Sequence, residues 1–523
     1  MARLAAQVSP EKEFRQGWIV FNGGLNLDRP NETEDNELQE AENFILNKRG
    51  ILITRPGSVK LNTGTLNLNE YFTHMVDYNR RSGASYTSHF IGFTNQGRMM
   101  RLESDGTYTQ IATGYAANIL FRSEIWQNTL IFSTDLTTRL QSYDATTVQN
   151  LSADAPFAKD LKYFNGKLWA IDDLTLYGSK DNDPTGWTPT PSTPDALQFF
   201  VAPDTGGRAM TLHRFFDSLL VGKQHFMVEL IGQSIADFRV GDKSIDAGVS
   251  FPGGMISVGN NVWVMDDTFV RSLAGVQQYG DINQSIINNK VHPFFEGSLK
   301  FKGLEKAFAE QMAMHHFHDR NLVLIAFTGK GDTTNSQVIF ADHTWDPNNP
   351  AWMIQKYPFP ISCFAKRQSA TLGEECYAAD YSGNIYRMLV PTATKDHVTS
   401  YVKRFLSGSK FFGDPRKYKR FMNVYFTFLS STPGDVTVRL KGLENEMFQQ
   451  MTVGGLSGSK WGSMVWGVDT WGGTDSNERV VLNDLNFRDI KLALGVSSSL
   501  DGHASFGEMI VDGTAKSYRR IGV

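Results

Sequence analysis

Histidines in the segment 314–319 are the residues best placed, by type and spacing, to do chemistry. Alternation along a strand would put His316 and His318 on one face and His315 on the other. Two imidazoles on one face could share a metal ion, and His343 is the nearest further imidazole. No second cluster completes such a site, so ordinary strand and loop histidines are the stronger interpretation. We therefore assign no metal site.

Motifs for other chemistries are missing from the sequence. It has no G-x-x-x-x-G-K-[ST], no G-x-G-x-x-G and no G-x-S-x-G motif, which argues against phosphoryl transfer, dinucleotide chemistry and Ser/His/Asp catalysis. Cys363 and Cys376 lack a nucleophile signature, and buried structural thiols are common. Residues 104–108 and 380–383 are better interpreted as hairpin turns than as glycosidase repeats. The sequence predicts no enzyme, no catalytic residue and no cofactor.

Length and composition indicate the elements that would carry any site. At roughly 150 residues per domain, 523 residues predict about three domains or one large repeat domain with additions. The 47 glycines and the 12% of aromatic residues favour turns and sheet, and 41% hydrophobic residues can fill a large core. A net charge of −4 gives no overall attraction to nucleic acid or to an anionic bilayer. No window approaches the roughly 18 apolar residues of a membrane span.

A β-hairpin recurs through the middle of the chain. Each copy has a bulky apolar residue, a short polar turn and a run of Leu, Val, Ile or Trp. A spacing of 38 to 60 residues between copies brackets the roughly 40–50 residues of a propeller blade. We predict an all-β protein with a β-propeller of about six or seven blades, and a stack of β-sandwich domains is the alternative. The copies are 126–132, 164–170, 216–222, 258–264 and 318–324, flanked by 91–102 and 377–388.

Two oppositely charged segments lie outside this middle region. Residues 28–42 hold seven acids, and we interpret them as an exposed loop or a short helix, because Leu38, Ala41 and Ile45 have helical spacing. Residues 403–420 hold seven bases and one acid, and lead into strand candidates of a small antiparallel sandwich. The basic segment could contact nucleic acid, or it could meet the acidic segment within the chain or across a subunit contact. The candidate contact residues are Asp28, Glu32, Glu34, Asp35, Glu37, Lys403, Arg404, Lys410, Arg416, Lys417, Lys419 and Arg420.

Both ends of the chain resemble one family. The N-terminal motifs are Gly23-Gly-Leu-Asn26, Asn36-Glu-Leu38, Ala41-Glu-Asn43, Gly50 and the predicted structural turn Arg55-Pro56-Gly57. The C-terminal run is Ser409-Lys-x-x-x-Gly413-x-Pro415-x-Lys417-x-Lys419-Arg420, followed by a Trp-rich region. With the propeller-like middle, these motifs resemble the tail hub, or nozzle, proteins of short-tailed bacteriophages.

The resemblance implies a structural virion protein of the phage tail, assembled in the host cytoplasm. It implies a homo-oligomer, with six copies forming a ring below the portal and its adaptor, which docks fibre, spike or plug proteins and conducts double-stranded DNA during genome ejection. It divides the chain into a platform segment 1–70, a propeller 71–394 inserted after it, and a C-terminal sandwich 395–523. Two alternatives stay open: a carbohydrate-binding or glycan-degrading propeller, and a receptor-binding hub at the tail tip.

Overall fold

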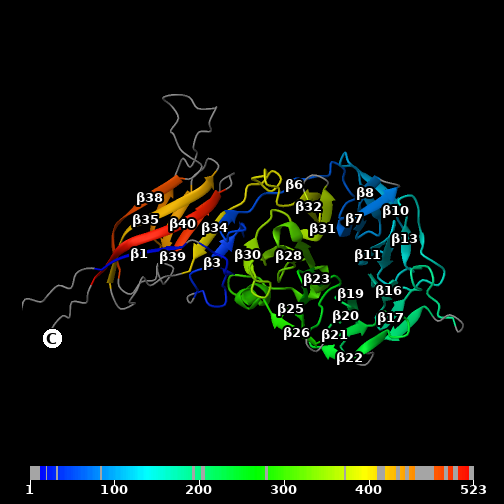
Figure 1. The fold of residues 1–523 in the computed structure, drawn as a ribbon. Coiled ribbons are helices and arrows are strands. Elements are labelled where there is room, and N and C mark those ends of the chain that lie inside the picture. Colours follow the sequence, from blue (N-terminus) through cyan, green and yellow to red (C-terminus); the bar gives the residue numbers. More distant parts are fainter. Residues whose placement is uncertain are drawn as a thin grey trace, which may run out of the picture. The chain divides into compact units, whose positions relative to one another are not determined.

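A computed structural model of the chain describes residues 12–18, 20–30, 33–82, 85–190, 195–201, 206–276, 281–369, 373–408, 418–431, 436–441, 447–453, 476–487, 493–498 and 504–516. The chain forms two compact units. The terminal unit contains Met1–Gly57, Ala351–Lys356 and Pro391–Val523, and the propeller unit contains Ser58–Pro350 and Tyr357–Val390. Figure 1 shows strands throughout both units. The division of the chain at residues 70 and 394 stays a prediction.

The propeller unit contains six four-stranded antiparallel sheets. The first sheet has β7 (Phe72–Ser82), β8 (Ser85–Thr94), β9 (Met99–Leu102) and β10 (Tyr108–Ala112). The second has β11 (Phe121–Trp126), β12 (Thr129–Thr134), β13 (Gln141–Tyr143) and β14 (Val148–Asn150), and the third has β15 (Asp160–Phe164), β16 (Lys167–Ile171), β17 (Thr175–Gly178) and β18 (Leu197–Phe200). The fourth has β19 (Ala209–Phe215), β20 (Ser218–Lys223), β21 (Met227–Ile231) and β22 (Arg239–Ile245), and the fifth has β23 (Met255–Val258), β24 (Asn261–Asp266), β25 (Phe269–Val276) and β26 (Asp281–Ile286).

The last of the six sheets closes the ring. It joins β31 (Ile361–Ser369), β32 (Gly373–Asp380) and β33 (Ile385–Arg387) to β6 (Val59–Lys60), so a strand from the start of the unit completes a sheet from its end. Before it come β27 (Ala313–Phe317), β28 (Leu322–Phe327) and β29 (Gln337–Asp342), which occupy the position between the fifth sheet and β31. The first strand of each set contacts the first strand of the next, from β7 round to β31 and back to β7. The predicted all-β propeller is confirmed.

The recurring hairpin of the sequence joins the first two strands of a sheet. It connects β11 to β12, β15 to β16, β19 to β20, β23 to β24 and β27 to β28. Gln127, Asn165, Phe216, Gly259 and Asn321 take the positive φ that these tight turns need. Side chains of neighbouring sheets fill the space between them: Phe93 of β8, for example, stacks on Phe121 of β11 at 4.8 Å between ring centroids.

Short helices lie on the connection between the fifth sheet and β27, and after β27. They are η1 (Asn289–Val291), α1 (His292–Glu296), η2 (Lys306–Gln311) and η3 (His318–Arg320). Phe294 and Phe295 of α1 are buried against Phe327 of β28, so α1 is held by the propeller core. No described helix is long and apolar enough to cross a membrane.

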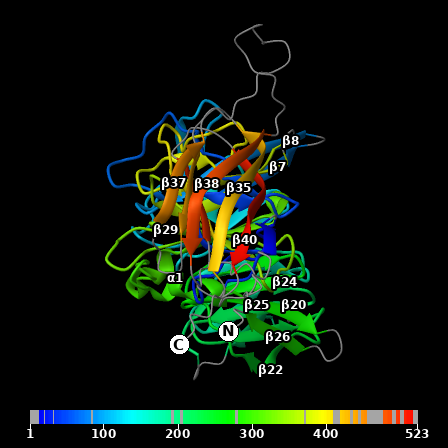
Figure 2. The same cartoon turned by 90° about the vertical axis from the view of Figure 1, so that its left-hand side faces the viewer.

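The terminal unit contains strands from both chain ends. One sheet has the order β38 (Ser476–Phe487), β35 (Tyr418–Ser431), β40 (Ala504–Lys516), β5 (Leu52–Thr54) and β4 (Phe44–Leu46), with β1 (Lys12–Trp18) also paired to β40. The other runs β30 (Ala351–Gln355), β3 (Glu37–Glu42), β34 (Lys403–Ser407), β39 (Ala493–Ser498), β36 (Val436–Lys441) and β37 (Met447–Val453), with β2 (Gly24–Leu25) paired to β3. Figure 2 shows β35 between β38 and β40.

The helix considered for residues 38–45 is wrong. Glu37–Glu42 form β3 and Phe44–Leu46 form β4, separated by Asn43 at a φ of 61°. Antiparallel pairing of β3 with β34 supplies backbone partners that an isolated helical turn would lack. The helical spacing of Leu38, Ala41 and Ile45 is therefore coincidental, because all three side chains are buried in a sheet.

Candidate functional site

The first strands of the propeller sheets surround two adjoining cavities. One has a volume of about 190 Å³ and the other about 310 Å³, and both are lined by His74, Arg122 and Gly253. We call the smaller one the Arg122 cavity and the larger one the histidine cavity. Strands β7, β11, β27 and β31 contribute residues to both of them. The site therefore exists only when sequence-distant strands meet in the closed ring.

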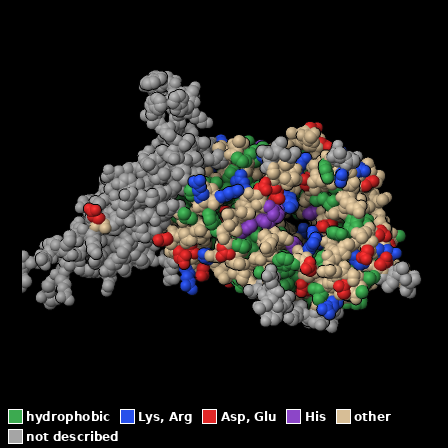
Figure 3. Space-filling view, in the orientation of Figure 1, with side chains coloured by type: hydrophobic (Ala, Val, Ile, Leu, Met, Phe, Trp, Pro, Cys, Tyr) green, Lys and Arg blue, Asp and Glu red, His purple; other side chains and the backbone are tan. Residues whose placement is uncertain are grey.

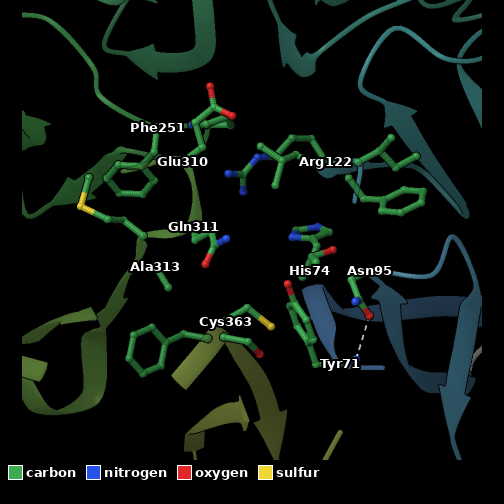
Figure 4. A pocket seen from close by; sticks show the side chains of 18 of the residues that line it. Tyr71, His74, Asn95, Arg122, Phe251, Glu310, Gln311, Ala313 and Cys363 are labelled. Carbon is green, nitrogen blue, oxygen red and sulfur yellow. Dashed lines mark hydrogen bonds between the residues drawn. The ribbon is translucent and has the colours of Figure 1, made fainter. Parts of the chain in front are cut away.

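Polar side chains enter the Arg122 cavity from three sides. Arg122, His74 and Gln311 surround the hollow in Figure 4, and Tyr71 directs its hydroxyl toward it. The Tyr381 hydroxyl donates to Gln311 Oε1 at 3.4 Å, and the rings of Tyr71 and Tyr381 lie 4.6 Å apart. The remaining walls are apolar or uncharged, apart from Glu310, an exposed carboxylate. This cavity combines one cation with hydrogen-bonding groups and aromatic surface.

Arg122 is a cation without a partner in the described part of the chain. Its Nε atom is buried and donates no hydrogen bond, and no carboxylate of a described residue lies within ion-pair distance of the guanidinium. Burial lowers the pKa of Arg122, and the nearby charge of Asp160 opposes that shift only in part. Asp160 itself accepts hydrogen bonds from Leu161 N at 2.8 Å, Thr211 Oγ1 at 2.7 Å and Leu212 N at 2.8 Å. Its oxygens are thus used to join β15 to β19.

Histidines and lysines line the second cavity, and Figure 3 shows histidines gathered around a hollow on the face of the propeller unit. Burial lowers the pKa of His74, His213, His315 and His316 to about 3, so these four imidazoles are neutral at pH 7. His74 Nε2 lies 2.8 Å from Ser123 Oγ, and His213 Nε2 lies 2.9 Å from Ser257 Oγ. Each pair connects two neighbouring first strands, so these histidines also hold the ring together.

His316 and His343 form a direct imidazole pair. His316 Nδ1 lies 2.8 Å from the carbonyl oxygen of Ser257, and its Nε2 lies 2.8 Å from Nε2 of His343. Because a carbonyl oxygen only accepts, we assign the hydrogen of His316 to Nδ1, which makes its Nε2 the acceptor from His343. The ring centroids of His316 and His318 are 4.0 Å apart. The three histidines singled out from the sequence do meet, yet no described group of three His, Cys, Asp or Glu side chains could hold a metal ion.

Both cysteines are buried and unpaired. Burial raises the pKa of Cys363 to about 12 and raises that of Cys376 as well. A reactive cysteine needs its thiolate, and neither environment provides it at neutral pH.

The two charged segments predicted as contacts are neighbouring strands of one sheet. Glu42 of β3 faces Arg404 of β34, with Arg404 Nε 2.9 Å from Glu42 Oε2. Of the candidate residues, Glu37 and Lys403 are buried, and Glu37 Oε2 accepts from Asn26 Nδ2 at 2.8 Å. The pairing within the chain is thus observed, and a subunit contact stays a prediction. Asp28, Glu34 and Asp35 lie in the loop before β3, Lys419 and Arg420 lie in β35, and Glu32, Lys410, Arg416 and Lys417 lie outside the described residues.

Arg55 of the predicted turn is fully buried in the terminal unit. Its Nη1 and Nη2 donate to the two carboxylate oxygens of Asp396 at 3.0 and 2.7 Å, and its guanidinium lies 4.3 Å from the ring centre of Tyr401. Gly57 has no room for a side chain, because a Cβ there would lie 1.9 Å from the carbonyl oxygen of Lys395. Residues 55–57 thus fasten the N-terminal segment to residues 395–401.

Comparison with known proteins finds only distant structural similarity. No protein-family model and no curated protein matches this sequence. The extracellular domain of a proposed one-component system from B. thetaiotaomicron is 11% identical with a TM-score of 0.40; the match covers 64% of this chain and 39% of that domain. The N-terminal domain of Nup159 is 10% identical with a TM-score of 0.40, covering 66% and 98%. The WD40 domain of Neurospora crassa Pan2 is 10% identical with a TM-score of 0.37, covering 64% and 94%.

Arg122 and Gln311 did not emerge from the sequence as site residues. A signal was present, because polar residues precede the recurring hairpin at strand spacing, as Arg122 and Glu124 do before Trp126. Asp160 and Lys162 stand in the same relation to Phe164. Reading the strand before each hairpin, as well as the hairpin itself, would have found the residues that line the cavities.

Proposed function

We propose that the chain is a structural protein of a phage virion that forms a tail hub or nozzle ring. The observation that supports this proposal is how the terminal unit is made. Residues 23–57, which carry the N-terminal resemblance, pair with strands from beyond residue 400, and the Arg55–Asp396 ion pair joins the same two segments. The propeller unit is inserted in the chain between these segments. A platform made from both chain ends is what the resemblance implies.

In the proposed role the chain acts through shape and self-association. Identical copies make a ring when two different patches on each copy bind one another repeatedly until the rotation closes. The ring, expected to hold six copies, attaches to the portal adaptor on one side and to fibre, spike or plug proteins on the other. A net charge of −4 suits a conduit for DNA, because a strongly basic bore would retain the genome through counterion release.

The test is the assembly state of the purified full-length chain. Native mass measurement and electron microscopy are expected to show a ring with a central opening. The variant K417E/K419E/R420E should weaken the ring and leave the monomer folded, as judged by circular dichroism. A matched control, K300E/K302E/K330E, reverses three exposed lysines of the propeller unit and should leave the ring unchanged. A monomer at all concentrations, or a closed particle without a bore, would contradict the proposal.

A second candidate function, carbohydrate binding, is favoured by the Arg122 cavity. Tyr71, Phe251 and Tyr381 offer aromatic surface there, and Gln311 offers hydrogen bonds. Glycoside hydrolysis usually needs two carboxylates, and among the residues that line this cavity only Glu310 is acidic. We therefore propose no hydrolytic step. A glycan array probed with the full-length chain tests this candidate. Binding to a glycan by a chain that stays monomeric would favour carbohydrate binding over the ring.

A further inference from the structure

Arg122 presents an unsatisfied positive charge to the smaller cavity of the propeller. A partly buried guanidinium without a counter-ion is unfavourable, because burial removes water and no carboxylate replaces it. Arg122 has neither an ion pair nor a hydrogen bond among the described residues, and its Nε is shielded from solvent. Gly253 leaves space for this side chain, since a Cβ there would lie 2.6 Å from Nη2 of Arg122. The guanidinium is thus accommodated by the backbone and left without a partner.

Two further hydrogen-bond donors face the same hollow. Gln311 accepts from Tyr381 through its Oε1, which leaves its amide nitrogen as the group without a partner in the described part of the chain. The Tyr71 hydroxyl likewise has no protein partner there, and Figure 4 shows it directed toward the hollow beside His74. A guanidinium, an amide N–H and a hydroxyl that converge without acceptors form a donor set for an oxyanion.

The cavity wall carries one positive and one negative side chain, Arg122 and Glu310, and Arg122 is the more enclosed of the two. Asp160 is the acid whose charge acts on Arg122, and three hydrogen bonds hold its carboxylate between β15 and β19. Glu310 is exposed to solvent, where water screens its charge, and His74 is neutral. In the adjoining cavity Lys162 pairs with Glu124 at 2.7 Å. Arg122 is therefore the one cation lining its cavity, and no acid there neutralises it by contact.

The volume limits what can bind. A cavity of about 190 Å³ has room for several water-sized groups, since one water molecule occupies at least roughly 10–15 Å³ of such space. We propose that the Arg122 cavity binds the carboxylate or phosphate group of a small-molecule ligand, with Arg122 as its main anchor and Gln311 and Tyr71 as additional donors. The inference goes beyond the proposed ring and is independent of it, because every residue in it belongs to the propeller unit.

Titration calorimetry of the full-length chain at low ionic strength tests the proposal. The probes are inorganic phosphate, acetate and glucuronate, with glucose as the uncharged comparison. We expect at least one anion to bind, with a dissociation constant of about 1 mM or below, and glucose to show no Arg122-dependent binding. Replacing one charge-assisted contact costs roughly a factor of ten or more in affinity, so R122Q should bind the anion at least tenfold more weakly. K366Q, which alters a lysine of the neighbouring cavity, is the matched control and should bind as the wild type does.

A thermal measurement separates a binding role from a structural one. R122M removes the unpaired charge and keeps most of the side-chain volume, so without added anion its melting temperature should equal or exceed that of the wild type. Added phosphate or glucuronate should raise the melting temperature of the wild type and not that of R122M. Binding of phosphate alone or of a carboxylate alone would identify the ligand's charged group. No anion binding to the wild type, or equal binding to R122Q, would overturn the proposal whether or not the chain forms a ring.

Discussion

Two arginines, a fully buried one in the terminal unit and a partly buried one in the propeller unit, have opposite surroundings. Arg55 donates to both oxygens of Asp396, stacks on Tyr401 and is fully enclosed. Arg122 is only partly buried, and it has no ion pair or hydrogen bond in the described part of the chain. A buried cation with an ion pair holds two chain segments together, whereas a cation without an ion pair can be stabilised by an anionic ligand. This difference supports a role in joining chain segments for Arg55 and the proposed binding role for the propeller cavity.

The largest expected effect comes from removing the partner of Arg55. D396A leaves an uncompensated buried guanidinium, and a loss of about 3–5 kcal/mol in the free energy of unfolding is expected. Urea denaturation gives the size of the loss, and hydrogen exchange locates it in residues 37–57 and 395–407. The double variant R55M/D396L should lose less than D396A, because it removes both charges together. If D396A lowered the free energy of unfolding by less than about 1 kcal/mol, the Arg55–Asp396 pair would not have the structural role that is meant to set it apart from Arg122.

Acid should weaken the propeller through its buried histidines. Burial lowers the pKa of His316 to about 3 and that of His343 to about 4, below 6.5 in the unfolded chain. Between about pH 6.5 and pH 4 the unfolded chain therefore binds more protons, and the free energy of unfolding falls by roughly 1.4 kcal/mol per pH unit for each such histidine. Above pH 6.5 this contribution is complete and constant.

Urea denaturation at pH 7, 6 and 5 measures this dependence. H316Q/H343Q should be less stable at pH 7 and should have a smaller slope with pH than the wild type. H225Q, at an exposed histidine that lines neither cavity, is the control for replacing a histidine elsewhere in the propeller unit. If the free energy of unfolding of the double variant depended on pH as steeply as that of the wild type, the His316–His343 pair would not cause the acid sensitivity.

The smallest effect is expected where opposite charges meet near the surface. R404Q removes the contact with Glu42, and the Arg404 side chain is half exposed. Lys356 also lies 3.2 Å from Glu42, so a second cation remains. The expected loss is about 0–1 kcal/mol, to be read from urea midpoints. A loss as large as that of D396A would mean that burial does not separate the two ion pairs.

Local patterns were sufficient to predict the propeller and to single out one motif of the terminal unit. The hairpins and their spacing predicted the ring of sheets, because each hairpin is specified within seven residues. The Arg55-Pro56-Gly57 motif was noticed for the same reason. Its partner Asp396 was not, since 341 positions separate the two residues. The strand β3 was missed because its partner β34 lies equally far along the chain.

The cavities could be predicted only in part. Strand alternation predicted that His316 and His318 share one face of a strand, but β27 ends at Phe317 and His318 begins η3. His316 nevertheless lies beside both His318 and His343. Arg122, Gln311 and Tyr71 come from separate strands or loops and carry no motif, so only ring closure brings them together. Arg122 combines a place in the cavity wall with the lack of a partner among the described residues, and neither feature leaves a pattern in a sequence.

The central claim is that the fully buried Arg55 and the partly buried Arg122 serve different purposes, and side-by-side unfolding of R55M and R122M in anion-free buffer tests it most directly. Hydrogen exchange assigns each change in stability to its own unit. The account predicts different changes in the free energy of unfolding. R55M removes the cation that pairs with the buried Asp396 carboxylate and should destabilise the terminal unit. R122M should leave the propeller unit as stable as before or more stable. Destabilisation of both units by similar amounts would contradict the account, because Arg122 would then be as structural as Arg55.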